Sequence, residues 1–209
     1  MIHRIVGLLA LSLAVCWSNA LAQRWEIAAN AGYMFGGNFK GVQYTVGDDA
    51  FIEDLKLKAA PAFGALVDFS FTENVQLEGL ARLQPTELQV KSSGEKLESL
   101  WINYYHAGFL FKIPSHWNPF AAITGGATHF LPKGDVESEL RGSLGVAFGA
   151  KTFFNEIWGV RLEGRFWGTY IKDSDSIYCS PPGSDNCYAY TSSIFMNQID
   201  LTAGVVARF

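Results

Sequence analysis

The strongest constraint on the fold is the alternation of residue types along the end of the chain, from Ile194 to Phe209. Apolar residues occupy one parity and polar or small residues the other, which is typical of a β-strand with one apolar and one polar face. The apolar parity contains Phe195, Ile199, Leu201, Ala203, Val205, Ala207 and Phe209, and the other parity contains Gln198, Asp200, Thr202, Gly204 and Arg208. Such a strand needs hydrogen-bonding partners on both edges, and closing the sheet into a barrel provides them. An outward apolar face would place that barrel in lipid.

Seven further stretches are predicted to be strands. They cover residues 24–35, 54–71, 75–85, 99–113, 120–130, 140–154 and 159–171. Proline cannot donate to a strand ladder, so Pro61 predicts a bulge or a local break in the second of these stretches. The stretch 120–130 is rich in glycine and its apolar parity is ambiguous, so the sequence does not orient it.

The connections between the predicted strands alternate in length. Those over 36–53, 86–98, 131–139 and 172–193 are long and polar, whereas those over 72–74, 114–119 and 155–158 are short. This pattern predicts an all-β fold, namely an eight-stranded antiparallel up-and-down transmembrane β-barrel with short periplasmic turns and long extracellular loops. A soluble sandwich or lipocalin-like barrel is the alternative, but it would turn its polar residues outward.

The first 22 residues have the pattern of a secretory signal peptide. A basic start is followed by a short apolar run from Ile5 to Trp17 and by a small-residue site at Ala20-Leu21-Ala22. A retained membrane anchor is the alternative, but the run is shorter than the roughly 20 residues that a spanning helix needs. We therefore divide the chain into a signal peptide, residues 1–22, and an outer-membrane barrel domain, residues 23–209.

The charge balance excludes one class of partner. Lys and Arg total 16 residues against 20 acidic ones, for a formal net charge of −4. Nucleic acid is therefore not expected as a partner, because binding phosphates requires a basic face. The sequence contains no cofactor motif and no set of metal ligands with recognisable spacing, so neither a cofactor nor a metal is expected.

Seven charged residues on the polar parity of the predicted strands are the candidates for the lumen. They are Glu78, Arg82, Lys151, Arg161, Glu163, Arg165 and Asp200. The interior of an eight-stranded barrel is just wide enough for side chains to fill it, and enclosed charges must pair because a lone buried charge is costly. We expect an ion-pair network that fills the lumen. The alternative is a gate whose rearrangement opens a narrow ion path.

With these features, the chain resembles the small OmpA/OmpX-type outer-membrane barrels of Gram-negative bacteria. The resemblance rests on the signal peptide, the eight alternating strands, the run from Val160 to Phe166 and the terminal run from Val205 to Phe209. It implies a porin-like barrel in the outer membrane, in contact with membrane lipid and lipopolysaccharide. It also implies that Phe209 is a signal read by the barrel-assembly machinery. The architecture hosts many activities, so the implied role is a structural or surface-interaction one.

A lipid-modifying enzyme, of the lipid A deacylase or acyltransferase type, is the alternative function. It would need a serine nucleophile, a histidine and an orienting acid on the lipid-facing surface. His106 lies on the lumen parity, His116 lies in a predicted periplasmic turn, and His129 has Thr128 beside it but no clear serine or acid partner. We therefore do not expect an enzyme.

Cys179 and Cys187 lie in the last predicted loop. In an exported protein a disulfide is the expected state of such a pair, and two free thiols are the alternative. The flanking residues Tyr178, Tyr188 and Tyr190 could contact an extracellular partner, or could pack only within the loop.

Overall fold

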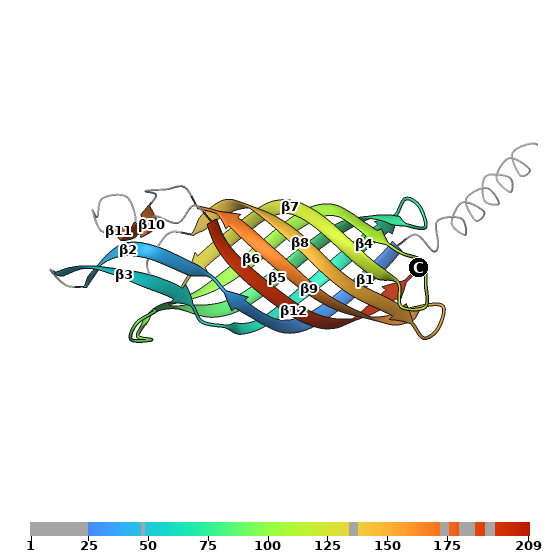
Figure 1. Ribbon diagram of the computed structural model, residues 1–209, viewed down its shortest axis with the longest axis horizontal. Helices are drawn as coiled ribbons and strands as arrows, with labels where there is room; N and C mark the ends of the chain where they lie inside the picture. The colour runs from blue at the N-terminus through green and yellow to red at the C-terminus, as the bar shows by residue number, and fades with distance from the viewer. Residues whose placement is uncertain (1–24, 47–48, 134–137, 172–175, 180–186, 191–194) are drawn as a thin grey trace, which may run out of the picture.

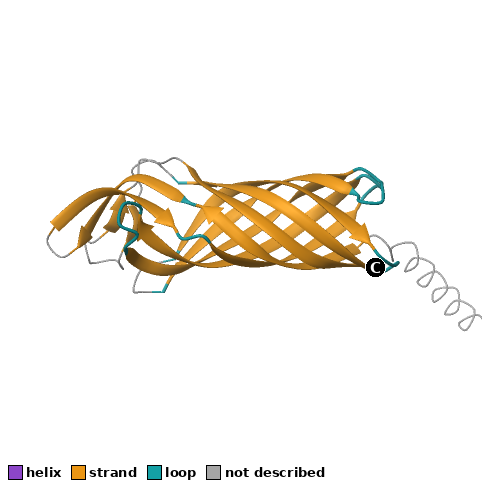
Figure 2. Ribbon diagram, turned by 60° about the horizontal axis from the view of Figure 1, so that its bottom comes forward, coloured by secondary structure: helices purple, strands orange, loops and turns teal. Residues whose placement is uncertain are grey.

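The computed structural model describes residues 25–46, 49–133, 138–171, 176–179, 187–190 and 195–209, and it describes no side chains within 41–52, 176–179 and 187–190. The predicted signal peptide lies outside the described residues. Those residues form twelve strands (Figures 1 and 2). The strands are β1 (Trp25–Gly36), β2 (Asn38–Val46), β3 (Asp49–Leu57), β4 (Ala60–Ser70), β5 (Val75–Val90), β6 (Lys96–Lys112), β7 (Pro119–Pro132), β8 (Glu139–Phe153), β9 (Trp158–Tyr170), β10 (Ser176–Cys179), β11 (Cys187–Tyr190) and β12 (Phe195–Arg208).

Eight of the strands in the described part of the chain form a closed antiparallel barrel in the order β1, β4, β5, β6, β7, β8, β9, β12. The first and last strands close it, with Ala31 opposite Ala203 in the β1–β12 register. The backbone N–H of Phe209 donates to the carbonyl of Trp25 at 2.8 Å, so the last residue is tied into this seam. The prediction of an eight-stranded up-and-down barrel is confirmed.

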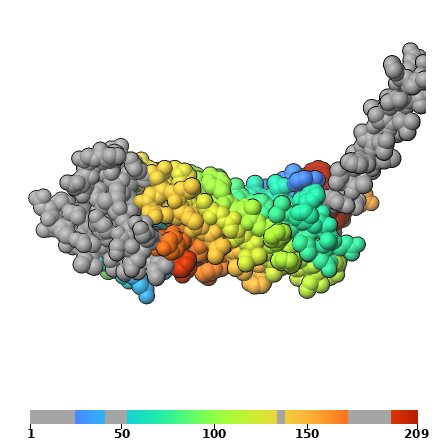
Figure 3. Space-filling model, turned by 90° about the horizontal axis from the view of Figure 1, so that it is seen from above, coloured from blue at the N-terminus to red at the C-terminus, as the bar shows by residue number. Residues whose placement is uncertain are grey.

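The outer wall of the barrel is apolar and the inner wall is polar. Phe63, Phe109 and Leu162 are 49%, 48% and 58% exposed on the outside, whereas Arg165 and Asp200 are enclosed. Figure 3 shows side chains of neighbouring strands packed into a continuous outer wall. A soluble barrel would have the reverse arrangement, so this wall is a surface for lipid acyl chains. Within the described ranges, no helix has the length and hydrophobicity needed to cross a membrane.

The predicted strand over 54–71 is divided into two strands, β3 and β4, joined at Lys58 and Ala59. The predicted break is therefore present, two residues before Pro61. Both run along β5 with different registers: Leu57 lies opposite Leu88, but Phe63 lies opposite Leu83. Between these two pairs the chain of β3 and β4 advances by six residues, while β5 advances by five. Such a bulge moves every later side chain to the other face. Consequently Leu55 and Leu57 point inward, although they share the sequence parity of the outward-facing Phe63.

Two predicted loops are largely strands that extend beyond the membrane-spanning wall. The stretch 36–53 contains β2 and the start of β3, which pair as a hairpin, and the stretch 86–98 contains the ends of β5 and β6. The turn between β5 and β6 covers only residues 91–95, where Gly94 adopts a positive φ of 73°. The extension lies at the end of the barrel opposite the short turns and the C-terminus (Figure 2).

The glycine-rich strand β7, which the sequence did not orient, turns its even-numbered residues inward. Phe120, Thr124, Thr128 and Phe130 are buried, whereas Ile123 is exposed to the outside. At the outer end of the lumen most of the buried side chains are apolar, with Thr86 among them as a polar one. The apolar side chains are Met34, Phe39, Leu55, Leu57, Leu88, Val90, Leu100, Ile102, Phe130, Ile171 and Met196, and we call them the apolar plug.

Candidate functional site: the charged lumen

Below the apolar plug, the lumen is filled with charged side chains. All seven predicted lumen residues are buried there, and they come from β5 (Glu78, Arg82), β8 (Lys151), β9 (Arg161, Glu163, Arg165) and β12 (Asp200). Period-2 alternation explains their common direction, because alternate residues of a strand point to the same face. The structure adds Glu26 of β1, Asp68 of β4 and the partly buried Lys112 of β6, which sequence reasoning missed. Their position on the polar parity could have identified them.

The centre of the network is a ring of two arginines and two glutamates. Arg161 donates to Glu78 at 2.5 Å and to Glu163 at 2.5 and 3.0 Å. Arg165 donates to the other oxygens of the same two carboxylates, at 2.6 Å to Glu78 and at 2.8 Å to Glu163. Each glutamate therefore bridges both arginines, which is the charge-assisted geometry that gives strong hydrogen bonds.

A second cluster lies closer to the short turns. Lys151 donates to Glu26 at 2.5 Å, to Asp68 at 2.9 Å and to the side-chain oxygen of Gln76 at 2.7 Å. Asp68 also accepts from Arg161 at 3.0 Å, so this cluster is continuous with the central ring. Three donor directions match the three protons of the lysine ammonium group.

A third cluster lies on the outer side of the ring. Arg82 forms an ion pair with Asp200 at 2.9 Å and a longer one with Glu163 at 3.7 Å, and it donates to Asn30 at 2.5 Å. The described lumen side chains thus include five acids (Glu26, Asp68, Glu78, Glu163, Asp200) and five bases (Arg82, Lys112, Lys151, Arg161, Arg165). The lumen is therefore electrically balanced.

The ion pairs span the full width of the barrel. Counting around the wall in either direction, β9 is four strands away from β5, and β8 is four strands away from β4. The pair between Arg161 and Glu78, and the pair between Lys151 and Asp68, thus join diametrically opposite walls. Side chains therefore meet across the whole diameter of the barrel at these two ion pairs.

A layer of polar and aromatic side chains separates the ring from the apolar plug. Trp167 stacks on Tyr104 with ring centroids 4.3 Å apart, and the guanidinium of Arg165 lies 5.4 Å from the Trp167 ring. The hydroxyl of Tyr104 donates to Gln198, which in turn donates to Gln84 at 3.0 Å. The polarity of the lumen therefore decreases outward, from ions to neutral polar groups to hydrocarbon.

A buried serine–histidine contact lies in this layer. His106 Nε2 is 2.7 Å from the hydroxyl of Ser143, and His106 Nδ1 is 3.2 Å from that of Thr124. A catalytic triad would place a carboxylate where Thr124 lies. The pair also faces the lumen and not the lipid, so it does not provide the surface site that a lipid-modifying enzyme needs.

The other two histidines do not form such a site either. His116 lies in the turn before β7 with its ring against Trp117, at 5.7 Å between centroids. Among the described side chains, His129 forms no hydrogen bond with a serine or an acid, and no group of three or more His, Cys, Asp and Glu residues could hold a metal ion.

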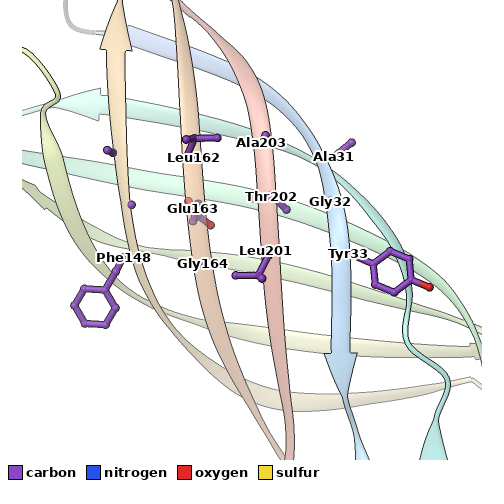
Figure 4. A pocket seen from close by; sticks show the side chains of 12 residues that line it. Ala31, Gly32, Tyr33, Phe148, Leu162, Glu163, Gly164, Leu201, Thr202 and Ala203 are labelled. Carbon is purple, nitrogen blue, oxygen red and sulfur yellow. The ribbon is translucent and has the colours of Figure 1, made fainter.

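A shallow depression lies on the outer wall across β1, β12, β9 and β8. Figure 4 shows the short side chains of Ala31 and Ala203 in a row with Leu162, and Tyr33 and Leu201 beside them. Its outward-facing lining is apolar and it is open to the lipid side. We therefore regard it as part of the lipid-facing wall.

The remaining predicted site residues lie at the two ends of the molecule. Cys179 of β10 lies opposite Cys187 of β11 in the strand register, but their side chains are outside the described part, so the disulfide stays a prediction. Phe209 is 54% exposed on the outer wall beside the seam between β1 and β12. Its role in assembly also stays a prediction.

A closed antiparallel barrel with an apolar outside and a charged inside defines the class, a membrane-spanning β-barrel. Solved structures support the same class. Outer membrane protein OprG from Pseudomonas aeruginosa is similar with a TM-score of 0.58 at 10% identity, over 90% of this chain and 97% of that one. Neisserial surface protein A (NspA) has a TM-score of 0.54 at 9% identity, over 88% of this chain and 97% of that one.

A third similar structure is outer membrane protein AlkL in lipid bilayers, with a TM-score of 0.56 at 12% identity over 90% of each chain. No protein-family model matches the sequence, and no curated protein matches it. The chain therefore has the fold of the small outer-membrane β-barrels, as the resemblance in the sequence implied. At this level of identity the similarity concerns the fold alone.

Proposed function

We propose that this protein is an integral outer-membrane β-barrel with a closed lumen, and that its role is structural or is carried by the surface that it presents outside the membrane. The observation that supports this most strongly is the balanced ion-pair network between diametrically opposite strands. A conducting lumen would need free width, and an eight-stranded barrel has none to spare once its interior is filled by side chains.

The apolar plug supports the same proposal. An ion that moves through the barrel would have to leave water and pass a layer of buried hydrocarbon, which is costly without polar partners. The narrow gated pore expected as an alternative would require both this layer and the ring of Arg161, Glu163, Arg165 and Glu78 to rearrange together.

Planar-bilayer recording tests this proposal. We expect no channel steps from the full chain, provided that heat-modifiable gel mobility verifies a folded barrel. Regular steps from folded wild-type protein would refute the closed lumen. Steps that appear only with Glu163→Ala and Arg165→Ala would support the gate, because these changes open the ring.

The extended strands are the surface that we propose for interaction with a partner. The hairpin of β2 and β3 continues the sheet beyond the membrane, and β11 pairs with β2. We propose that the Cys179 and Cys187 pair is oxidised and rigidifies the last loop beside this sheet. Peptide mapping without reductant should recover the two cysteines as one linked fragment. Deletion of residues 181–186 should reduce binding to host or bacterial surfaces, and unchanged binding would indicate simple loop packing.

We also propose that Phe209 is read by the barrel-assembly machinery of a Gram-negative outer membrane. The motivation is its exposed ring at the barrel seam. Phe209→Ala should slow insertion by the purified machinery into vesicles. Insertion at the wild-type rate would argue against this role.

A further inference from the structure

A pocket lies on the barrel wall where β3 and β4 meet, outside the charged lumen. Its volume is about 390 Å³, and its lining includes Tyr33, Lys58, Pro61, Pro85, Glu87 and Lys133. The bulge creates it, because the ladder between β4 and β5 stops at Phe63 and Leu83 and resumes with a shifted register at Leu57 and Leu88. Pro61 and Pro85 have no N–H groups to pair across this interval.

The pocket carries positive charge. Lys58 and Lys96 both form ion pairs with Glu87, at 3.0 and 3.3 Å, so one carboxylate faces two ammonium groups. Lys133 lies in the same lining and forms no ion pair with any other described residue. Glu87 is the one acid among the described lining residues, so the local balance favours an anion.

The pocket also lies at the level of the lipid headgroups. Tyr33, whose hydroxyl donates to the carbonyl of Ala59 at 3.0 Å, and Trp101, which lies opposite Pro85, are exposed on the outside of the wall. Tyrosine and tryptophan in a barrel mark the membrane–water interface. Directly below, the cross-strand pair of Phe63 and Leu83 belongs to the apolar belt. A lipid seated here would have its headgroup against the lysines and its acyl chains over Phe63 and Leu83.

We propose that this pocket binds the phosphate of an outer-leaflet lipid, with the phosphate held between Lys58 and Lys133. The inference rests on the proposed outer-membrane location. A phosphorylated lipid fits both parts of the surface, because ammonium groups bind phosphate as point charges and the belt below offers only hydrocarbon contacts. An anion without acyl chains would contact the lysines alone and leave the apolar belt uncovered.

Native mass spectrometry of the full chain in detergent, with diphosphoryl lipid A and with its dephosphorylated counterpart as probes, tests the proposal. Each lysine near a membrane surface contributes roughly a fivefold gain in affinity for anionic lipid. Lys58→Gln with Lys133→Gln should therefore weaken binding of diphosphoryl lipid A about 25-fold. Lys40→Gln in β2 with Lys91→Gln in the turn between β5 and β6 removes the same charge outside the pocket lining, and should leave binding unchanged.

Three outcomes would overturn the proposal. They are equal binding by both double variants, equal binding of the two lipid probes by the wild type, and displacement of the lipid by millimolar inorganic phosphate, which would indicate a site for the free anion. Should the double variant fail the heat-modifiable mobility assay, the single variants provide the test, each with an expected loss of roughly fivefold. A wild-type chain that does not insert into vesicles would instead refute the proposed function itself.

Discussion

Replacing Arg161 with methionine tests whether the ring in the lumen stabilises the barrel. Arg161 contacts three buried carboxylates, those of Asp68, Glu78 and Glu163, each at 3.0 Å or less. After the change, Lys151 still faces Asp68 and Arg165 still faces both glutamates, but the lumen holds one uncompensated negative charge. Removing one partner of a buried ion network costs about 3 to 5 kcal/mol of unfolding free energy. Arg161→Met should cost that amount.

A second substitution separates charge balance from packing. Glu163→Gln alone leaves an excess positive charge, whereas Arg161→Met combined with Glu163→Gln restores neutrality. We expect the double variant to be more stable than the sum of the two single effects predicts, by about 1 to 3 kcal/mol. The exposed pair of Lys91 and Asp54, 3.4 Å apart, gives the control, and Lys91→Gln should cost less than about 1 kcal/mol.

The measurement is urea unfolding of the barrel folded into phospholipid vesicles, followed by tryptophan fluorescence and by heat-modifiable mobility. Trp167 lies beside the network, with its ring 5.4 Å from the Arg165 guanidinium, so its fluorescence contributes to the signal. If Arg161→Met lowers the unfolding free energy no more than Lys91→Gln does, the view that the ring holds opposite walls together is refuted. Additive single effects would refute the role of charge balance.

Three further predictions concern the wall and its outer rim. Leu201 lies in the middle of the lipid-facing side of β12 and is 55% exposed. Leu201→Arg should lower the unfolding free energy in vesicles by about 2 to 4 kcal/mol if this face contacts lipid, whereas the same change at a leucine exposed to water would be tolerated. Gly126→Ala should reduce folding yield on gels, because its Cβ would lie 2.0 Å from the Tyr105 carbonyl oxygen, whereas Gly125→Ala, with 3.6 Å to the nearest atom, should fold normally. Hydrogen bonds from Lys58 and Lys96 hold the pKa of the Glu87 carboxyl below its ordinary value. The contribution of this pairing to folding stability is therefore present above the ordinary value and is lost as the pH falls through the lowered pKa. Lys58→Gln should raise this pKa in a carboxyl NMR titration, and an unchanged midpoint would contradict the pairing.

The sequence was sufficient to predict the barrel because period-2 alternation shows which face of each strand contacts lipid and which face is enclosed. A residue such as Arg165 cannot face acyl chains, so its parity fixes the inward face of β9 and, through it, the outward face of Leu162 and Phe166. Strand β7 lacked this signal because glycine and alanine differ little in hydrophobicity. Its orientation is set by its neighbours, which place Thr124 opposite Gly108 and Gly145.

Two features could not be predicted, because they depend on register. Pro61 predicted a break in the stretch 54–71 but not its effect on side-chain direction. The apolar parity continues from Leu57 to Phe63, and only pairing with β5 reveals the extra residue that turns one inward and the other outward. Likewise, parity places Glu78 and Arg161 in the lumen but does not give their positions along the barrel axis. Their contact depends on the stagger of the closed sheet.

The distribution of polarity along the lumen indicates where a function can reside. In the central ring each acid bridges both arginines, so a substrate or an ion there would have to replace these contacts. At the outer end of the lumen most buried side chains are apolar. With the lumen closed as proposed, what remains available is the outside of the molecule at its outer end, where the sheet continues past the membrane and where the bulge before Ala60 interrupts the wall. A bulge is costly to keep in an otherwise regular ladder, and here it creates both the start of the β2–β3 hairpin and the cationic pocket beside it. A variant that removes the extra residue, by deletion of Ala59, should therefore lose the pocket and reverse the inward direction of Leu55 and Leu57 together.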